Sequence, residues 1–367
     1  MINDNDLQNI LIKASFRAAS KQHNDGSFDA GCNGPYKHAE TPVRNTAHWL
    51  SLFCYALRTN KLNLQERKYL EESSRKAVSY LLSSDSRPNK KSFFCRSATG
   101  KDACNGLIGQ AWTIEGLITV YNELNMEKAR NLALEVFFLH PFDYEKGIWK
   151  RVEIDGTILG FDYTFNHQLW FAAIAIQLND PSAEKMVKCF LDIIGQNVDI
   201  YSDGIIFHAT NIAKYNVLKF SDIPGYLKAL LRKFQKPRLK KALYIKSVGY
   251  HSFNLYAYAI LKKYFPSHGF WKSETFLKML STTNNKDFLD NLDKCPYGWP
   301  YNPTGIELAY VGKVFSLGEE YVQKWLSMQY KKTYDSVSDD LMTKGSPDTT
   351  TSSARIYEAV RIVDNSL

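Results

Sequence analysis

The chain has 367 residues, of which 44% are hydrophobic and 14% aromatic, and its formal charge at neutral pH is +8. This composition can build a large core and excludes an intrinsically disordered chain. The apolar runs are shorter than the roughly 18 to 20 residues that span a bilayer, and no basic segment followed by an apolar run opens the chain. We therefore expect a folded, cytoplasmic protein.

In chain order, amphipathic helices alternate with helices that are apolar almost all round. The amphipathic helices are predicted at residues 7–19, 65–82, 127–139, 182–195, 273–281 and 319–330. The apolar helices, which must be buried on more than one side, are predicted at residues 42–57, 103–121, 163–178, 249–261, 302–315 and 350–363. This alternation predicts an all-α fold, an (α/α)6 barrel with six inner and six outer helices in a single domain of residues 1–367.

One long interruption separates the third and fourth apolar helices. Residues 197–248 begin with the strand-like segment DIYSDGIIFHAT and continue into a basic stretch, which predicts an insertion beside one mouth of the barrel. Within it, residues 228–246 carry eight Lys or Arg and no acidic residue. An anionic glycan or an anionic membrane surface could bind this stretch, whereas nucleic acid is not the favoured partner. A solvated helical hairpin is the alternative interpretation.

No cofactor or metal ion is expected. The six cysteines form no C-x-x-C pair, and neither H-E-x-x-H nor a cluster of His and Asp at ligand spacing is found. The chain also lacks the glycine-rich phosphate-binding motifs and G-x-S-x-G. Metal catalysis, nucleotide hydrolysis, dinucleotide redox chemistry and the α/β-hydrolase route are therefore not supported.

The inner helices of such a barrel all begin at the same end, so the residues near their starts are expected to converge on one cavity. Carboxylates and histidines are the candidates for acid/base catalysis, and they are Asp162, Asp102, His167, His48 and His251. Candidates for substrate binding are Arg44, Asn105, Asn166, Trp49, Trp112, Trp170, Trp299, Tyr301 and Asp348.

The chemistry of these candidates suits an anionic sugar. Glycoside hydrolysis requires two carboxyl groups, aromatic rings offer apolar platforms for sugar faces, and Arg44 could bind a uronate carboxylate through two hydrogen bonds. Each residue also has a purely structural interpretation. An Asp before a helix commonly caps it, which contributes about 1 kcal/mol, and a single His in a helix commonly belongs to the core.

Three motifs resemble those of the (α/α)6 unsaturated glucuronyl and rhamnogalacturonyl hydrolases. They are Asp162-Tyr-Thr-Phe-Asn166 followed by HQLWFAA, Lys101-Asp102-Ala-Cys-Asn-Gly106, and Asp348 with Ser352-Ser353-Ala354. In that family the aspartate of the first motif is the general acid and base that hydrates a C4–C5 double bond. The resemblance implies this role for Asp162, with Asp102 as its partner.

The chain is also similar to toroid proteins of surface-glycan assembly clusters, which are linked to hexuronic acid processing, and to N-acylglucosamine 2-epimerases. The latter use inner-helix histidines as acid and base, which implies such roles for His48, His167 and His251. The leading hypothesis is a hydrolase-like enzyme that acts by acid/base catalysis on a uronic-acid-containing or otherwise anionic glycan. The alternatives are a sugar isomerase or epimerase of surface-polysaccharide or glycan biosynthesis, and a non-catalytic glycan-binding protein held at a membrane by residues 228–246.

Overall fold

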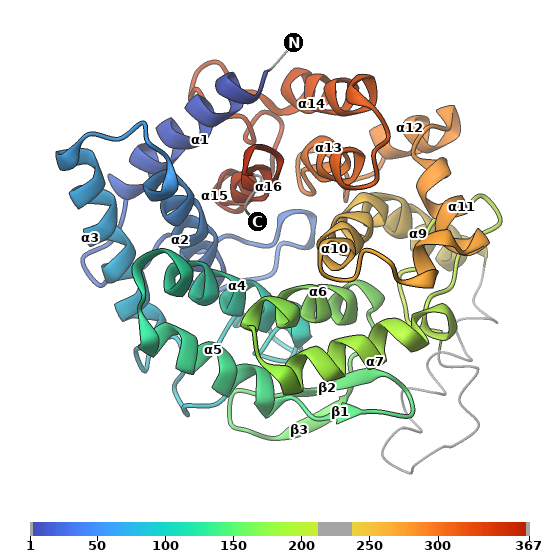
Figure 1. The fold of residues 1–367 in the computed structure, drawn as a ribbon, viewed down its shortest axis with the longest axis horizontal. Helices are drawn as coiled ribbons and strands as arrows, with labels where there is room; N and C mark the ends of the chain where they lie inside the picture. Colours follow the sequence, from blue (N-terminus) through green and yellow to red (C-terminus); the bar gives the residue numbers. More distant parts are fainter. Residues whose placement is uncertain (1–2, 212–236, 365–367) are drawn as a thin grey trace.

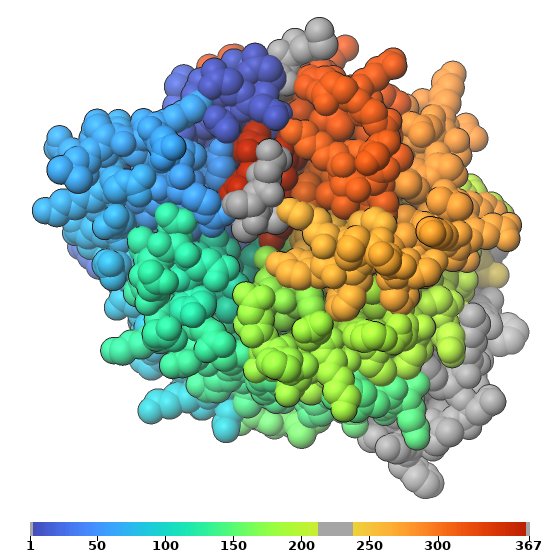
Figure 2. All heavy atoms as spheres, viewed as in Figure 1, coloured from blue at the N-terminus to red at the C-terminus, as the bar shows by residue number. Residues whose placement is uncertain are grey.

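The computed structural model describes residues 3–211 and 237–364, which form two concentric rings of helices (Figure 1). The chain passes alternately from the outer ring to the inner ring. The ring closes where α1 (Asp4–Ala19) packs against α16 (Val360–Val363), and Figure 2 shows the blue N-terminal part beside the red C-terminal part. The predicted (α/α)6 barrel is confirmed.

The inner ring consists of the apolar helices, and each begins within three residues of its predicted start. Its last position is filled by three short consecutive helices rather than one. The inner helices are α2 (Val43–Arg58), α4 (Gly106–Leu124), α6 (Phe165–Ala175) with η2 (Ile176–Leu178), α10 (His251–Tyr264), α13 (Thr304–Val314), and α15 (Thr349–Ala354) with η6 (Arg355–Ala359) and α16. Because neighbouring helices cover them on most sides, nearly all their residues are buried.

The outer ring contains the amphipathic helices, and their starts carry clear capping signals. Asn3 and Asn63 each form a capping box, and Asp180 caps the helix that begins at Pro181. Besides α1, the outer helices are α3 (Leu64–Leu81), α5 (Glu127–Leu139), α7 (Pro181–Asn197), α11 (Glu274–Thr282), α12 (Lys286–Asp293) and α14 (Glu319–Thr333). Helix α12 was not predicted, and it extends the outer ring beside α11 (Figure 1).

A small antiparallel sheet connects α5 to α6 and was also not predicted. Its strands are β1 (Phe142–Asp143), β2 (Ile148–Val152) and β3 (Ile158–Phe161), in the order β1-β2-β3. Trp149 pairs with Phe142 across the first two strands, and Lys150 pairs with Phe161 across the second and third. The sheet positions two polar residues, because β3 ends immediately before Asp162 and β2 carries Arg151.

The predicted insertion at 197–248 lies only partly within the described residues. The strand-like segment forms isolated bridges, Ile200 with Ile206 and Thr164 with Ala209, instead of a continuous strand. Residues 212–236 lie outside the described part, and with them the first half of the basic stretch, residues 228–236. Its last residues belong to helix α9 (Pro237–Gly249), which leads directly into α10. Among the described helices, none combines the length and the apolar character needed to cross a membrane.

Candidate active site

The first turns of the inner helices converge on one cavity of about 660 Å³, as expected for this fold. Its volume lies within the range of roughly 300 to 1,000 Å³ that is typical of small-molecule sites. Every inner position contributes a residue at or near its start: Arg44 from α2, Asn105 before α4, His167 from α6, Phe253 from α10, Asn302 before α13 and Arg355 from η6. The remaining wall comes from β2, β3 and α9, from the segment that contains His208, and from the loops that precede the inner helices.

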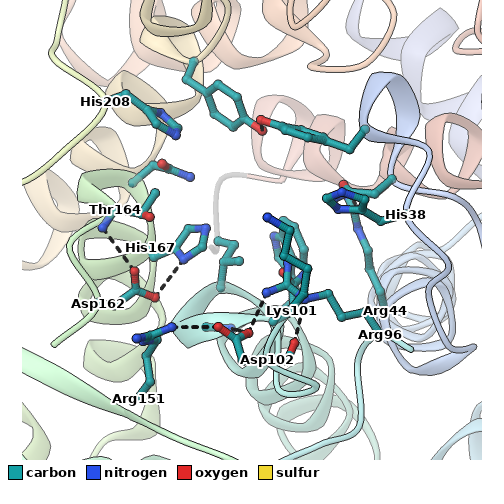
Figure 3. A pocket seen from close by; sticks show the side chains of 18 of the residues that line it. His38, Arg44, Arg96, Lys101, Asp102, Arg151, Asp162, Thr164, His167 and His208 are labelled. Carbon is teal, nitrogen blue, oxygen red and sulfur yellow. Dashed lines mark hydrogen bonds and ion pairs between the residues drawn. The ribbon is translucent and has the colours of Figure 1, made fainter. Parts of the chain in front are cut away.

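A histidine–aspartate pair lies at the start of α6 and faces the cavity (Figure 3). His167 Nδ1 lies 2.8 Å from Asp162 Oδ2. Asp162 also accepts hydrogen bonds from the backbone N–H groups of Leu107, at 3.0 Å, and of Thr164, at 3.1 Å. Burial raises the pKa of Asp162, but the charge and hydrogen bond of His167 outweigh burial and hold this pKa below its ordinary value.

This geometry fixes the orientation of the imidazole. An ionised Asp162 accepts the Nδ1 proton of His167, which leaves Nε2 of the neutral ring as a proton acceptor. The ring is about one-fifth exposed, whereas the Asp162 side chain is almost completely buried. His167 is therefore the member of the pair that a ligand in the cavity would meet.

Asp102 lies between two arginines on the neighbouring wall (Figure 3). Its carboxylate oxygens are 2.6 Å from Arg96 Nη2 and 2.7 Å from Arg151 Nη1, and the backbone N–H of Gly106 donates to it at 2.9 Å. Burial raises the pKa of Asp102, but the charges of Arg96 and Arg151 outweigh burial and lower it. Asp102 is consequently an ionised acceptor.

Glu153 is the third carboxylate that lines the cavity in the described part of the chain. It accepts hydrogen bonds from the backbone N–H groups of Ala103, Cys104 and Ile154, at 3.0, 3.1 and 2.8 Å. All three carboxylates thus accept at least three N–H bonds each. For Asp102 and Asp162 these surroundings favour the ionised form, so neither is arranged as a proton donor.

Arg44 forms the floor of the cavity beside Trp112. Its guanidinium lies 4.0 Å from the centre of the Trp112 ring, and Nη1 donates to Asn33 at 3.1 Å and to Glu40 at 3.3 Å. The residue is 2% exposed, and its Nη2 is buried without a hydrogen-bond partner. A buried guanidinium nitrogen without a partner is costly, so Arg44 remains a predicted binding residue of the cavity.

The wall opposite Arg151 is aromatic. The hydroxyl groups of Tyr36, Tyr250 and Tyr301 form a chain with separations of 3.0 and 3.2 Å. The rings of His208 and Tyr250 have their centres 4.9 Å apart. Figure 3 shows His208 on the side of His167 and His38 across the cavity. This wall offers both apolar ring faces and hydrogen-bonding groups to a sugar.

The structure brings eight of the fourteen predicted site residues together at the cavity: Arg44, Asp102, Asn105, Trp112, Asp162, Asn166, His167 and Tyr301. Their roles stay predictions. The other six lie elsewhere, and their expected position at the cavity is wrong.

Two of these six are histidines of the core. His48 lies below Arg44, 1% exposed, with its ring stacked on Tyr357 at 4.4 Å. His251 is completely buried, where its Nδ1 accepts from the backbone N–H of Ile206 at 3.2 Å and its Nε2 lies 3.0 Å from a carbonyl oxygen. Burial lowers the pKa of His251 to about 4, so this ring is a neutral, hydrogen-bonded core residue.

The remaining four support the packing of the barrel. Trp170 is completely buried and donates to a backbone carbonyl of α10, Trp49 packs near Phe28, and Trp299 stacks on a tryptophan of the outer ring. Asp348 caps α15 and accepts backbone N–H groups from the loop before α2. Asp348 thus has the structural role that its position before a helix indicates.

Several cavity residues were missed because they lie outside the inner helices. They are Tyr36 and His38 in the loop before α2, Arg96 and Lys101 before α4, Arg151 on β2, Glu153, His208, and Lys246 on α9. The only signal in the sequence was indirect, since several of them adjoin Asp102 or the strand-like segment. In the described residues, no group of three His, Cys, Asp or Glu side chains is close enough to share a metal ion.

Comparison with known proteins finds a relative that covers nearly the whole chain. No family model matches it. Archaeal glycosylation protein Q of Haloferax volcanii is 39% identical over 368 residues, which cover 98% of each chain.

Solved structures share the fold. Cellobiose 2-epimerase from Bacillus thermoamylovorans B4167 matches with a TM-score of 0.64 and 11% identity over 98% of both chains. The α-1,6-mannanase of Salegentibacter sp. HEL1_6 matches with a TM-score of 0.52 and 10% identity over 99% of this chain and 100% of the mannanase. At these identities the likeness shows the (α/α)6 fold alone.

Proposed function

The chain belongs to the family of archaeal glycosylation protein Q, and from this premise we propose that it is a sugar isomerase or epimerase of glycan assembly. The observation that carries the proposal is the His167–Asp162 pair, whose imidazole faces the cavity with Nε2 available to accept a proton. An oriented histidine of this kind is the usual general base of proton transfer near neutral pH.

In this mechanism His167 Nε2 removes a proton from a carbon next to the carbonyl group of an open-chain sugar. The electrons of the C–H bond pass to the carbonyl oxygen, and an enediolate forms. Return of a proton to the neighbouring carbon gives an isomer, and return to the opposite face of the first carbon gives an epimer. Asp162 keeps the imidazole oriented and stabilises the imidazolium that forms.

The charge of the cavity supports an anionic sugar. Six cationic side chains and three carboxylates line it in the described part of the chain. The buried Nη2 of Arg44 lacks a hydrogen-bond partner, and a uronic acid carboxylate would supply one. The Trp112 ring against which Arg44 packs would contact the sugar face.

Hydrolysis of a uronic-acid-containing glycan is the alternative. It would need one protonated carboxyl group as an acid and a second carboxylate as base or nucleophile. Because Asp102, Glu153 and Asp162 are all held as acceptors, the cavity favours proton transfer by histidine. Hydrolysis therefore takes second place, and glycan binding without catalysis takes third.

The test is deuterium exchange. Free hexuronates, whose open-chain form carries the carbonyl group that the mechanism needs, are incubated with the protein in D2O, and mass spectrometry and NMR follow deuterium entering a C–H position. We expect carbon-bound deuterium with the wild type and a loss of about 100-fold or more in His167→Asn. His23→Asn, which changes a partly exposed histidine outside the cavity, is the matched control and should exchange normally.

Two results would overturn the proposal. One is exchange at the wild-type rate in His167→Asn. The other is cleavage of a uronate glycan without any carbon-bound deuterium, since hydrolysis of a saturated glycosidic bond exchanges no carbon-bound proton.

A further inference from the structure

Three cations gather on one wall of the cavity, next to the His167–Asp162 pair (Figure 3). Arg96 and Arg151 share a single carboxylate, that of Asp102, at 2.6 and 2.7 Å. Lys101 adjoins Asp102 in the chain, and Figure 3 shows it within the same group. The Arg151 charge also acts on the neighbouring Asp162 carboxylate, so three positive charges face two negative charges at this wall.

Two nitrogen atoms of this wall have no partner in the described structure. Arg151 Nε is buried without a hydrogen bond. Lys101 is exposed to the cavity, and its ammonium group forms neither a hydrogen bond nor an ion pair with any described residue. Because side-chain ammonium and guanidinium groups only donate, both positions await an acceptor.

The wall is held in place before any ligand arrives. Arg96 Nε donates to the backbone carbonyl of Asp102 at 2.7 Å, and Asp102 in turn accepts the backbone N–H of Gly106. The side chains of Arg96 and Arg151 are 13% and 29% exposed, so much of each guanidinium is already removed from water. Charge-assisted hydrogen bonds are stronger in such a partly desolvated site.

We propose that this wall, Arg96, Lys101 and Arg151, binds a phosphate group that is attached to the sugar. The substrate is then a sugar phosphate ester, whose phosphate lies at this wall while its carboxylate lies on Arg44. A phosphate has enough acceptor oxygens for several donors at once and carries more negative charge than a carboxylate. A neutral sugar would leave the excess charge uncompensated.

This inference rests on the proposed function for the location of the sugar, but its test does not need turnover. Isothermal titration calorimetry with inorganic pyrophosphate, at low and at physiological salt, measures the wall directly. We expect binding by the wild type that weakens as salt rises. In Lys101→Ala and in Arg151→Ala, the affinity should fall about tenfold or more.

The control is Lys68→Ala, which removes one positive charge from the exposed face of α3 far from the cavity. It should bind pyrophosphate like the wild type. If Lys68→Ala weakens binding as much as Lys101→Ala, or if pyrophosphate does not bind at all, the inference is wrong. The deuterium exchange of free hexuronates would be unaffected by that outcome, so the two proposals can fail separately.

The source of the phosphate is tested in two further arms. A soluble sugar phosphate is titrated in the first, with its phosphate on a hydroxyl group other than the anomeric one, so that the open-chain carbonyl form stays accessible. In the second, the protein is sedimented with phosphatidylcholine vesicles that contain or lack phosphatidic acid. Loss of binding on Lys101→Ala in either arm supports a phosphate ester and identifies the carrier as soluble or lipid. If the protein binds in both arms and the Lys101→Ala variant binds as well as the wild type, the inference is contradicted.

Discussion

At the scale of single residues, the His167–Asp162 pair depends on the absence of a side chain at Gly106. Gly106 has a φ of +60°, and a Cβ atom there would lie 2.5 Å from Asp162 Oδ2 and 2.7 Å from His167 Nδ1. Gly106→Ala should therefore displace the pair and reduce deuterium exchange by about 100-fold or more. The measurement is the exchange assay together with chemical denaturation.

A matched control separates this steric effect from backbone strain. Gly345 has a φ of +73° and nothing within 4 Å of its added Cβ atom, and it lies in a loop away from the cavity. Gly345→Ala should lower the free energy of unfolding by about 1 kcal/mol, because a left-handed conformation disfavours alanine, and should leave exchange intact. Equal activities of the two variants would show that Gly106 does not protect the pair.

Asp162 also contributes to stability in a way that depends on pH. The pKa of Asp162 is lowered because its interactions with His167 and with backbone N–H groups outweigh burial. The ionised carboxylate therefore stabilises the folded state fully above the unfolded pKa of about 3.9. This stabilisation is lost as pH falls through the lower pKa of the folded state. Asp162→Asn should therefore lower the free energy of unfolding by about 2 kcal/mol at pH 7. Urea denaturation at pH 7 and below pH 4 measures the difference, which should shrink in acid; a constant difference would contradict the argument.

At the scale of elements, the two rings impose opposite demands on glycine. Gly116 of α4 lies against α2, and an added Cβ atom would be 2.8 Å from the backbone oxygen of Ala47. Gly195 of α7 has nothing within 4 Å. Gly116→Ala should destabilise the protein by about 1 to 3 kcal/mol, whereas Gly195→Ala should stabilise it by about 0.5 to 1 kcal/mol. Thermal and chemical unfolding would reveal the sign, and destabilisation by both substitutions would refute the packing argument.

The helices could be predicted from the sequence because the inner helices are long runs that are mostly apolar and carry few charges. The sheet could not, since β1 and β3 have only two and four residues, and such short strands are defined by their partners. The same limit explains why Arg151 was not predicted as a cavity residue. Its place at the cavity depends on how β2 pairs, which no local pattern encodes.

Which of the inner-helix histidines faces the cavity could not be predicted either. His48 and His167 both lie in the first turns of inner helices, at the sixth position of α2 and the third of α6. Each step along the helix turns the side chain by about 100° around the helix axis. A change of one or two positions in the sequence therefore decides whether a side chain faces the cavity or the core. The presence of polar residues at the cavity was predictable, whereas the identity of the one that faces the ligand required the structure.

At the scale of the whole molecule, buried charges join helices across the middle of the barrel. Arg355 of η6 donates to Glu358 at 2.7 Å and to Glu307 of α13 at 3.2 Å, and it also lines the cavity. Arg361 of α16 is 2.7 Å from Glu115 of α4. Since a buried charge without a partner is strongly unfavourable, these pairs fix the C-terminal helices in the ring and connect the stability of the barrel to the floor of the site.

This buried cluster predicts that the free energy of unfolding decreases as pH rises toward 8. Burial and the neighbouring Glu358 carboxylate raise the pKa of Glu307 to about 8, against the lowering effect of Arg355. The folded protein then holds a proton that the unfolded chain, with a glutamate pKa near 4.3, has released. The stabilisation is complete below the unfolded pKa and is lost as pH rises toward 8, with a slope of at most about 1.4 kcal/mol per pH unit for one proton.

Measurement between pH 6.5 and 8 isolates this effect. Buried histidines such as His140 and His251, whose pKa values burial lowers to about 4, affect stability only below their unfolded pKa of about 6.5. We expect the free energy of unfolding of the wild type to decrease across this window and that of Glu307→Gln to stay nearly level. Glu72→Gln, on the exposed side of α3, should follow the wild type. Parallel pH profiles for the wild type and Glu307→Gln would mean that the cluster holds no such proton, and that the charge of the barrel centre is balanced by its arginines alone.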